Sequence, residues 1–214
     1  RLRTARLANT DDRRRAGLCE NISGVEAGSI KENVKKYQVI YADPPWRYDF
    51  TKDNADAIEA HYPTMSVDEI KALDVPSADN AVLYLWATAP KLQEALDVIK
   101  AWGFDYKTHA IWDKGWVGMG YWFRGQHELL MVGVKGKWSP PEQTLRISSV
   151  IKQNKGVHSR KPSYVREMIH EWFPQATKLE MFCRENQANM FQPDAQWDIW
   201  GNELGNDVQI AIAA

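Results

Sequence analysis

A short apolar run, Val39–Ala42 (VIYA), ends abruptly in an acid, two prolines and a tryptophan, Asp43–Trp46 (DPPW). The run is typical of a buried β-strand. Proline cannot donate to the hydrogen-bond ladder of a sheet, so the strand must end there. Because the prolines also fix their own φ angles, the backbone after the strand leaves in a defined direction. The sequence thus predicts polar acceptors and an indole at the carboxyl end of an inner strand.

These residue types suit one kind of chemistry. The Asp43 carboxylate and the nearby carbonyl groups can accept hydrogen bonds from an NH2 group, and the Trp46 indole can stack on a flat base. Such a set suits methylation of an exocyclic amine on a nucleobase. The alternative is structural, since prolines often close strands, a tryptophan beside them is usually core, and short motifs have many false positives.

Composition sets the class of protein but not its partner. A chain of 214 residues with 44% hydrophobic and 26% charged residues predicts one globular domain with a full core. Tryptophan is unusually frequent, with 10 copies, which suits both a core and a site that grips flat rings. The formal net charge of −1 means that bulk charge gives no argument for a nucleic-acid partner.

We predict three segments, a basic N-terminal arm or helical extension (1–35), a catalytic domain (36–204) and a C-terminal tail (205–214). The arm either touches phosphates or forms a solvated helix face, and both readings remain open. Its basic residues are Arg1, Arg3, Arg6, Arg13, Arg14 and Arg15. Cys19 and Cys183 match no metal or redox spacing. Without a bilayer-length apolar stretch or a secretion-type start, we expect a cytoplasmic protein with no membrane partner.

Strand and helix signals alternate along the chain, which predicts an α/β fold with a mostly parallel sheet and helices on both faces. We expect Ala81–Trp86 to be an inner parallel strand because it is continuously apolar. The other expected strands are Phe104–Trp112, Glu128–Val134, Lys178–Cys183 and Asp198–Gly201. The expected helices run from Pro90 to Gly103, from Pro162 to Pro174, and over Ser66–Leu73 with a Ser66–Glu69 capping box.

Two longer irregular stretches are predicted, Arg47–Tyr62 and Lys114–Gln126. Long loops in a compact domain are usually functional or disordered. The second loop mixes four glycines with Trp116, Tyr121, Trp122 and Phe123. That mixture favours a flexible lid that can cover a base over a poorly packed surface excursion.

With its Asp-Pro-Pro-Trp motif and a series of further blocks, the chain resembles the MT-A70 family of adenine N6-methyltransferases. Each matching block is weak alone, but their order and spacing together are specific. The blocks are VIYADPPW (39–46), HYPTMSVDEI (61–70), LYLWAT (83–88), IW (111–112), HELLMVGVKG (127–136), HSRKP (158–162), KLEMFCR (178–184) and WGNEL (200–204). The resemblance implies a class I, Rossmann-like methyltransferase fold with a permuted motif order, which uses S-adenosyl-L-methionine. The compact form is similar to bacterial and phage members.

The resemblance also implies a catalytic set. Asp43 would accept one amine hydrogen, and the Pro44 carbonyl the other. Pro45 would hold the geometry, and Trp46 would pack on or near the target ring. No strong base is needed before transfer, because the amine becomes acidic once it is alkylated.

By the same resemblance, Tyr62, Trp112 and Glu128 line the acceptor pocket. Tyr62 and Trp112 would stack on or wall the base, and Glu128 would hydrogen-bond its edge. A base inside a duplex must be flipped out or supplied single-stranded to reach such a pocket. Two alternatives remain open, that Trp112 is core and that Glu128 forms a structural ion pair with His127.

For the cofactor, the resemblance points to Asp43 and a second set of residues. Lys161 precedes a helix-opening proline, where anions are favoured, and would reach the methionine carboxylate or the acceptor, unless it is an exposed loop lysine. The others are Phe182 and Arg184 at the apolar edge and ribose, and Asn202 and Glu203 at the ribose and adenine. Glu203 stands where many relatives carry Gln, and an acidic adenine contact upstream of Asp43 has no clear counterpart.

The leading expectation is therefore methyl transfer from S-adenosyl-L-methionine to adenine N6 in DNA, with nucleic acid as partner and a possible homodimer or partner subunit. The alternatives are the same reaction on RNA, a catalytically silent nucleic-acid-binding subunit, and methylation of protein glutamine. A silent subunit would usually lose the Asp-Pro-Pro-Trp set, which is whole here. The blocks outside that motif argue against a glutamine substrate.

Overall fold

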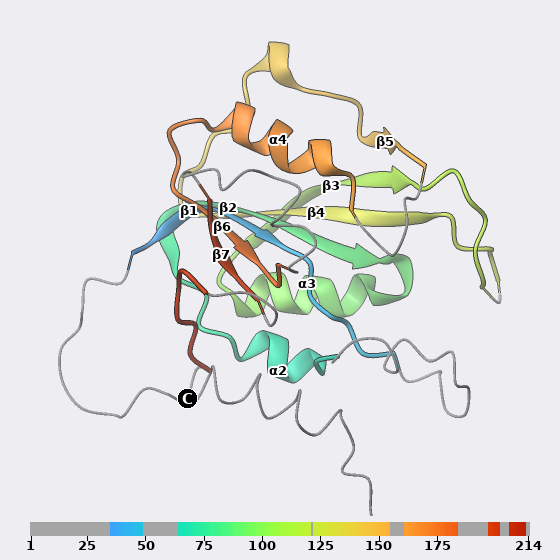
Figure 1. Cartoon of the computed structure of the whole chain (residues 1–214), viewed down its shortest axis with the longest axis horizontal. Coiled ribbons are helices and arrows are strands. Elements are labelled where there is room, and N and C mark those ends of the chain that lie inside the picture. The colour runs from blue at the N-terminus through green and yellow to red at the C-terminus, as the bar shows by residue number, and fades with distance from the viewer. Residues whose placement is uncertain are drawn as a thin grey trace, which may run out of the picture.

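A seven-stranded sheet forms the centre of the computed structural model, which describes residues 35–48, 64–120, 122–154, 161–183, 197–201 and 206–212 (Figure 1). The strand order is β5-β3-β4-β2-β1-β6-β7. The strands are β1 (Tyr37–Ala42), β2 (Ser77–Thr88), β3 (Asp105–Asp113), β4 (His127–Lys135), β5 (Val150–Lys152), β6 (Lys178–Met181) and β7 (Trp197–Trp200).

The direction of the strands decides where the functional residues meet. β1 pairs in parallel with β2 and β6, β6 with β7, and β3 with β5, whereas β4 is antiparallel to both β2 and β3. All strands except β4 therefore run the same way, and their carboxyl ends share one edge with the start of β4. The predicted α/β class and mostly parallel sheet are confirmed. The prediction for Ala81–Trp86 needs one correction, because β2 is parallel only to β1.

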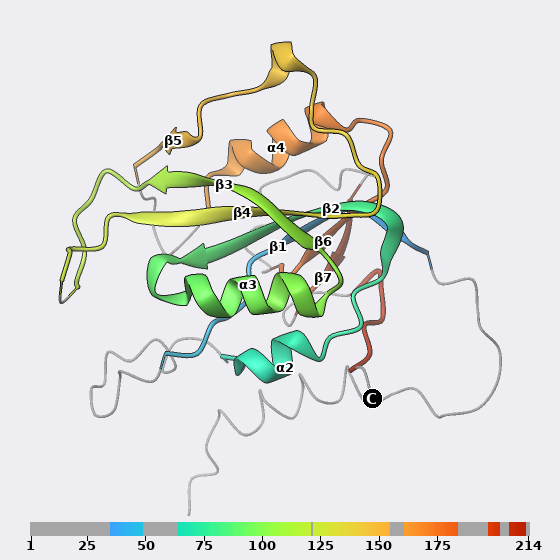
Figure 2. The ribbon, with the colours of Figure 1, turned by 180° about the vertical axis from the view of Figure 1, so that it is seen from behind.

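Helices cover both faces of this sheet, as expected. α2 (Val67–Lys71) and α3 (Leu92–Ala101) lie on one face, and α4 (Ser163–Trp172) lies on the other (Figure 2). Short 3-10 turns occupy Ala89–Lys91 (η2) and Gln143–Leu145 (η3).

The helix boundaries follow the local signals. The capping box of α2 is confirmed, since the Ser66 hydroxyl accepts from the Glu69 N–H at 3.2 Å and the Glu69 carboxylate accepts from the Ser66 N–H at 2.7 Å. Pro162 caps α4. Gly103 follows α3 with a φ of 80°, a conformation that glycine adopts without a Cβ penalty.

Two apolar clusters fill the space between these layers. The α2/α3 face buries Ile40, Leu83 and Leu85, and the α4 face buries Tyr41, Trp86 and Ile169. β2 contributes to both clusters, which explains its long apolar run. Within the described residues, no helix is long and apolar enough to cross a membrane.

Residues 206–212, which we assigned to a tail, pack against the α2 side of the sheet. Val208 and Ile210 are buried in the α2/α3 cluster. The Asp74 N–H donates to the Ala211 carbonyl at 2.8 Å, and Leu73 and Ile212 form an isolated antiparallel bridge. This segment therefore contributes to the core of the folded body.

Candidate active site

The turn after β1 is fixed by backbone hydrogen bonds. The Trp46 N–H donates to the Pro44 carbonyl at 2.9 Å, and the Met65 N–H donates to the Pro45 carbonyl at 2.8 Å. Trp46 and Met65 form a parallel bridge, closed by a 3.2 Å bond from the Arg47 N–H to the Met65 carbonyl. Since two prolines and three hydrogen bonds hold this turn, the Asp43 carboxylate is presented from a rigid support.

Three charged side chains meet at this edge of the sheet. The Lys161 ammonium lies 2.8 Å from the Asp43 carboxylate and 3.3 Å from the Glu128 carboxylate. Lys114 adds a second cation 3.3 Å from Glu128. We call Asp43, Lys161, Glu128 and Lys114 the charged cluster. The structure thus brings three predicted site residues together, and the alternative of an exposed Lys161 is wrong because the side chain is largely buried.

Two members of the cluster, Glu128 and Lys161, favour their charged forms. Burial alone would raise the pKa of the Glu128 carboxyl, but the ammonium groups of Lys161 and Lys114 bring it below its usual range. Burial alone would lower the pKa of Lys161, but the carboxylates of Asp43 and Glu128 raise it above its usual range. Lys161 is thus held as a cation between two anions at neutral pH.

Aromatic rings form the floor beneath these charges. The Lys161 nitrogen lies 5.7 Å from the centre of the Trp86 ring, a cation–π distance, and Trp86 packs edge-to-face on Trp112 at 6.0 Å. The Trp112 indole N–H donates to the Gln153 carbonyl at 2.8 Å, and only 1% of the residue is exposed. Among the described residues, Trp112 is therefore a core residue below the cluster, and its contact with a base stays a prediction.

Trp46 is also placed in the core. It is 6% exposed in the α2/α3 cluster, and its indole N–H donates to the Trp86 carbonyl at 3.1 Å. The ring thereby ties the turn to the end of β2. This anchoring function is visible in the structure, whereas stacking of Trp46 on a target ring remains a prediction.

Tyr48 and Thr88 complete the site and were missed from the sequence. The Tyr48 hydroxyl lies 2.6 Å from the Thr88 hydroxyl at the end of β2, directly across the β2–β4 pair from Glu128. Burial raises the pKa of Tyr48, and the charges of Glu128, Lys161 and Asp43 act on it as well. The signal for Thr88 was its place at the end of the LYLWAT block. Tyr48 had no signal beyond its closeness to Trp46.

The end of β6 lies beside β1, and the ends of β6 and β7 approach each other closely. Phe182 has a φ of 63°, the one non-glycine residue with a positive φ in the described part of the chain. Such backbone strain is concentrated at functional sites. Its ring packs edge-to-face on Trp200 at 5.2 Å. A Cβ on Gly201 would lie within 2.9 Å of the Cys183 nitrogen and would collide with the Cys183 carbonyl oxygen, so only glycine fits there.

The other predicted site residues, Tyr62, Arg184, Asn202 and Glu203, lie outside the described residues. Their parts in binding stay predictions. The described residues contain no group of three or more His, Cys, Asp or Glu side chains that could hold a metal ion.

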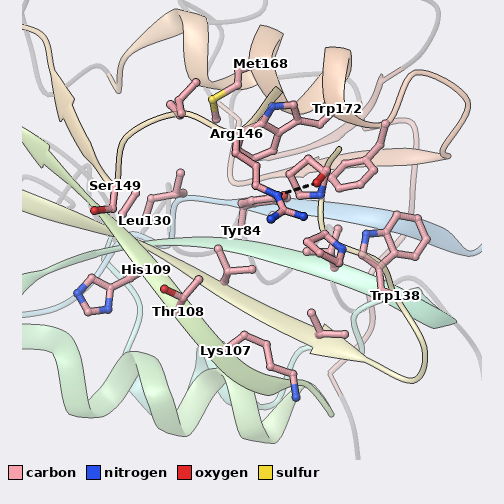
Figure 3. Close-up of a pocket in the computed structure, with 18 of the residues that line it drawn as sticks. Tyr84, Lys107, Thr108, His109, Leu130, Trp138, Arg146, Ser149, Met168 and Trp172 are labelled. Carbon is pink, nitrogen blue, oxygen red and sulfur yellow. Dashed lines mark hydrogen bonds between the residues drawn. The ribbon is translucent and has the colours of Figure 1, made fainter. Parts of the chain in front are cut away.

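A separate cavity of about 510 Å³ lies on the α4 face (Figure 3). It is walled by Tyr84, Trp138, Met168 and Trp172, and Arg146 beside it donates to the Pro141 carbonyl at 3.0 Å. Neither Asp43, Glu128 nor Lys161 lines it. The largely apolar cavity is thus separate from the charged cluster at the carboxyl edge of the sheet.

A mostly parallel sheet with a rigid Asp-Pro-Pro-Trp turn at its carboxyl edge is the architecture of a Rossmann-like methyltransferase. The MT-A70 family model matches residues 37–203, so this chain belongs to the MT-A70 family and is by class an adenine N6-methyltransferase. The last strands of the chain extend the sheet from the early strand β1, since β6 pairs with β1 and β7 pairs with β6. The permuted motif order stays a prediction.

Named relatives agree with this class. The chain is similar to the type II methyltransferase M.MunI of Mycoplasma sp, with 35% identity over 82% of each chain. It is also similar to an N(6)-adenosine-methyltransferase MT-A70-like protein of Arabidopsis thaliana, with 29% identity over 89% of this chain, and to the human N(6)-adenosine-methyltransferase catalytic subunit METTL3, with 28% identity over 79%. It spans only 28% of the length of each of these two proteins.

Proposed function

We propose that this protein transfers a methyl group from S-adenosyl-L-methionine to the exocyclic N6 amine of adenine in DNA. The observation that carries the proposal is the rigidly held Asp43 carboxylate, which lies at the carboxyl edge of the sheet with Lys161 at 2.8 Å. Ligands of open α/β sheets bind at this edge.

The chemistry of the described groups fits the cofactor. Its amino-acid end carries both a carboxylate and an ammonium, and the site offers the Lys161 cation beside the Asp43 anion. Lys161 also lies just before the N-terminus of α4, which favours anions. The partly buried Phe182 ring at the end of β6, which packs on the buried Trp200, offers an apolar surface. When bound, the cofactor supplies an electrophilic methyl group.

The chain itself has to orient a poor nucleophile, because the amine lone pair is delocalised into the adenine ring. A carboxylate oxygen of Asp43 accepts one amine hydrogen. The Pro44 carbonyl oxygen, which already accepts from the Trp46 N–H, has a second lone pair for the other hydrogen. Holding both hydrogens turns the nitrogen lone pair toward the methyl donor. After transfer, Asp43 or water takes the released proton.

Lys161 links the two carboxylates of this site. It lies between Asp43 and Glu128, and its ammonium helps to hold the pKa of the Glu128 carboxyl below its usual range. Glu128 then faces the acceptor base as a hydrogen-bond acceptor, held in place by Lys114.

Two comparisons favour DNA over RNA. This chain and the bacterial type II methyltransferase cover each other to 82%, which matches the compact form seen in the sequence. The relatives named for adenosine, a ribonucleoside, share less identity with this chain, 29% and 28% against 35%. RNA remains the second candidate because those relatives match over most of this chain.

The test is transfer of a tritiated methyl group to single- and double-stranded DNA and RNA of matched sequence, followed by digestion to nucleosides. We expect N6-methyldeoxyadenosine as the main product. Methylated adenosine in RNA alone would move the substrate to RNA. Cofactor turnover without either nucleoside would reject the proposal, and tight nucleic-acid binding without cofactor affinity would indicate a silent subunit.

A further inference from the structure

The connection between β3 and β4 is a hydrogen-bonded hairpin that projects beyond the sheet (Figure 1). The Lys114 N–H donates to the Gln126 carbonyl at 2.9 Å. Further along, the Gly118 N–H donates to the Gly125 carbonyl at 2.8 Å, and the Gly125 N–H donates to the Met119 carbonyl at 2.9 Å. We call the described residues of this connection, 114–120 and 122–126, the aromatic hairpin. The lid predicted from the sequence is thus an arm with its own backbone pairing.

The tip of this hairpin exposes large apolar side chains. Trp122 is 95% exposed, Phe123 90%, Met119 87% and Trp116 71%. The two sides of the hairpin approach too closely for a side chain at two of its glycines. A Cβ on Gly120 would collide with the Phe123 carbonyl, and one on Gly118 would lie 2.9 Å from the Gly125 carbonyl oxygen. Several large apolar side chains exposed on one short segment indicate an interaction site.

Charge indicates which partner fits. The hairpin carries two cations, Lys114, which is paired with Glu128, and the exposed Arg124, and it has no acidic residue, although the whole chain has a net charge of −1. Rings interleaved with cations match single-stranded nucleic acid, in which bases stack on aromatic faces and phosphates meet Lys or Arg. A protein partner would not require this local positive charge.

The hairpin is also joined directly to the charged cluster. Lys114 at its base lies 3.3 Å from Glu128, and Gln126 at the other side donates to the Asp113 carboxylate at 2.9 Å. If a nucleic-acid strand places its target adenine at Asp43, the bases next to that adenine therefore come close to the hairpin.

We propose that the aromatic hairpin is a stacking platform for unpaired bases next to the target adenine, so that the protein engages single-stranded or locally opened nucleic acid. This proposal deepens the proposed function and rests on it for the identity of the target. The stacking itself is a binding event, which can be measured without methyl transfer.

The experiment measures binding by fluorescence anisotropy of a labelled single-stranded DNA oligonucleotide and its duplex. We expect Trp122→Ala and Phe123→Ala each to weaken single-strand binding at least about fivefold, whereas Trp122→Phe retains most of it. Tyr106→Ala is the matched control, because it removes another exposed ring from the opposite end of β3. A 2-aminopurine beside the target adenine should be quenched by the wild type and less by Trp122→Ala.

Unchanged oligonucleotide affinity in both alanine variants would overturn the proposal. If light scattering then showed that the wild type is a dimer and Trp122→Ala a monomer, the hairpin would be a protein interface instead. Single-strand binding that depends on Trp122 in a protein without any methyl transfer would leave this inference standing and reject the proposed function.

Discussion

The Lys161 ammonium lies 2.8 Å from each carboxylate oxygen of Asp43, although 118 positions separate the two residues in the chain. The ion pair joins the start of α4 to the end of β1. The ion pair makes Asp43, the proposed acceptor of the amine hydrogen, part of a charged network with Lys161 and Glu128. Substitutions at these residues should therefore differ in their effects on activity and on stability.

Replacing Asp43 tests the chemistry with little cost to the fold. We expect Asp43→Ala and Asp43→Asn to lower methyl transfer by about 100-fold or more, because the amine loses the acceptor that orients it. The melting temperature should change little, since Lys161 keeps Glu128 as a partner. Near-normal turnover in a folded Asp43→Ala protein would contradict the assignment.

Replacing Lys161 tests the network. Lys161→Met leaves Asp43 and Glu128 close together without their shared cation, so we expect a loss of about 2 kcal/mol in the free energy of unfolding at pH 7, measured in urea. Lys161→Arg should retain more of this stability. The double variant Lys161→Met/Glu128→Gln should recover part of the loss, and no recovery would argue against the pairing.

The lowered pKa of Glu128 predicts a pH dependence of stability. A carboxyl group whose pKa falls on folding stabilises the protein above its unfolded pKa of about 4.3, and this contribution is lost as the pH falls through the folded value. Wild type should therefore exceed Glu128→Gln in unfolding free energy from pH 5 to 8, and the difference should shrink below pH 4. A difference that stayed constant down to pH 3 would contradict the shift.

The close approach at Gly201 predicts a coupled effect on stability and cofactor binding. Gly201→Ala pushes the end of β7 from Cys183, so we expect a loss of about 1–3 kcal/mol in unfolding free energy and weaker S-adenosyl-L-methionine binding by calorimetry. Gly136→Ala is the control, because its Cβ collides with the Asp79 carbonyl at the opposite edge of the sheet. That variant should be destabilised without a change in cofactor affinity.

Tyr48 is predicted to position the end of β2. Tyr48→Phe removes the hydroxyl that lies 2.6 Å from Thr88, and we expect a loss of about 1 kcal/mol in stability and a lower kcat with little change in KM. Thr88→Val removes the other hydroxyl and should resemble it, while the double variant should cost little more than either single one. Additive losses would show that the two hydroxyls act separately.

The sequence by itself determined the features that depend on neighbouring residues. Pro44 and Pro45 end β1 because they lack the N–H that a ladder needs, and Ser66 with Glu69 starts α2 through contacts three residues apart. The spaced blocks also predicted the family, which the comparisons confirmed. The alternation of strand and helix signals predicted the α/β class, which the sheet confirms.

Only the tertiary structure decided how distant segments meet. The antiparallel direction of β4 brings Glu128 to the same edge as Asp43, and the crossover to α4 brings Lys161 between them. Trp112 could have lined a pocket or the core from its sequence position, and its packing on Trp86 placed it in the core. Local backbone preferences specify where an element begins and ends, whereas a charged network or a buried ring depends on sheet order and on which faces pack together.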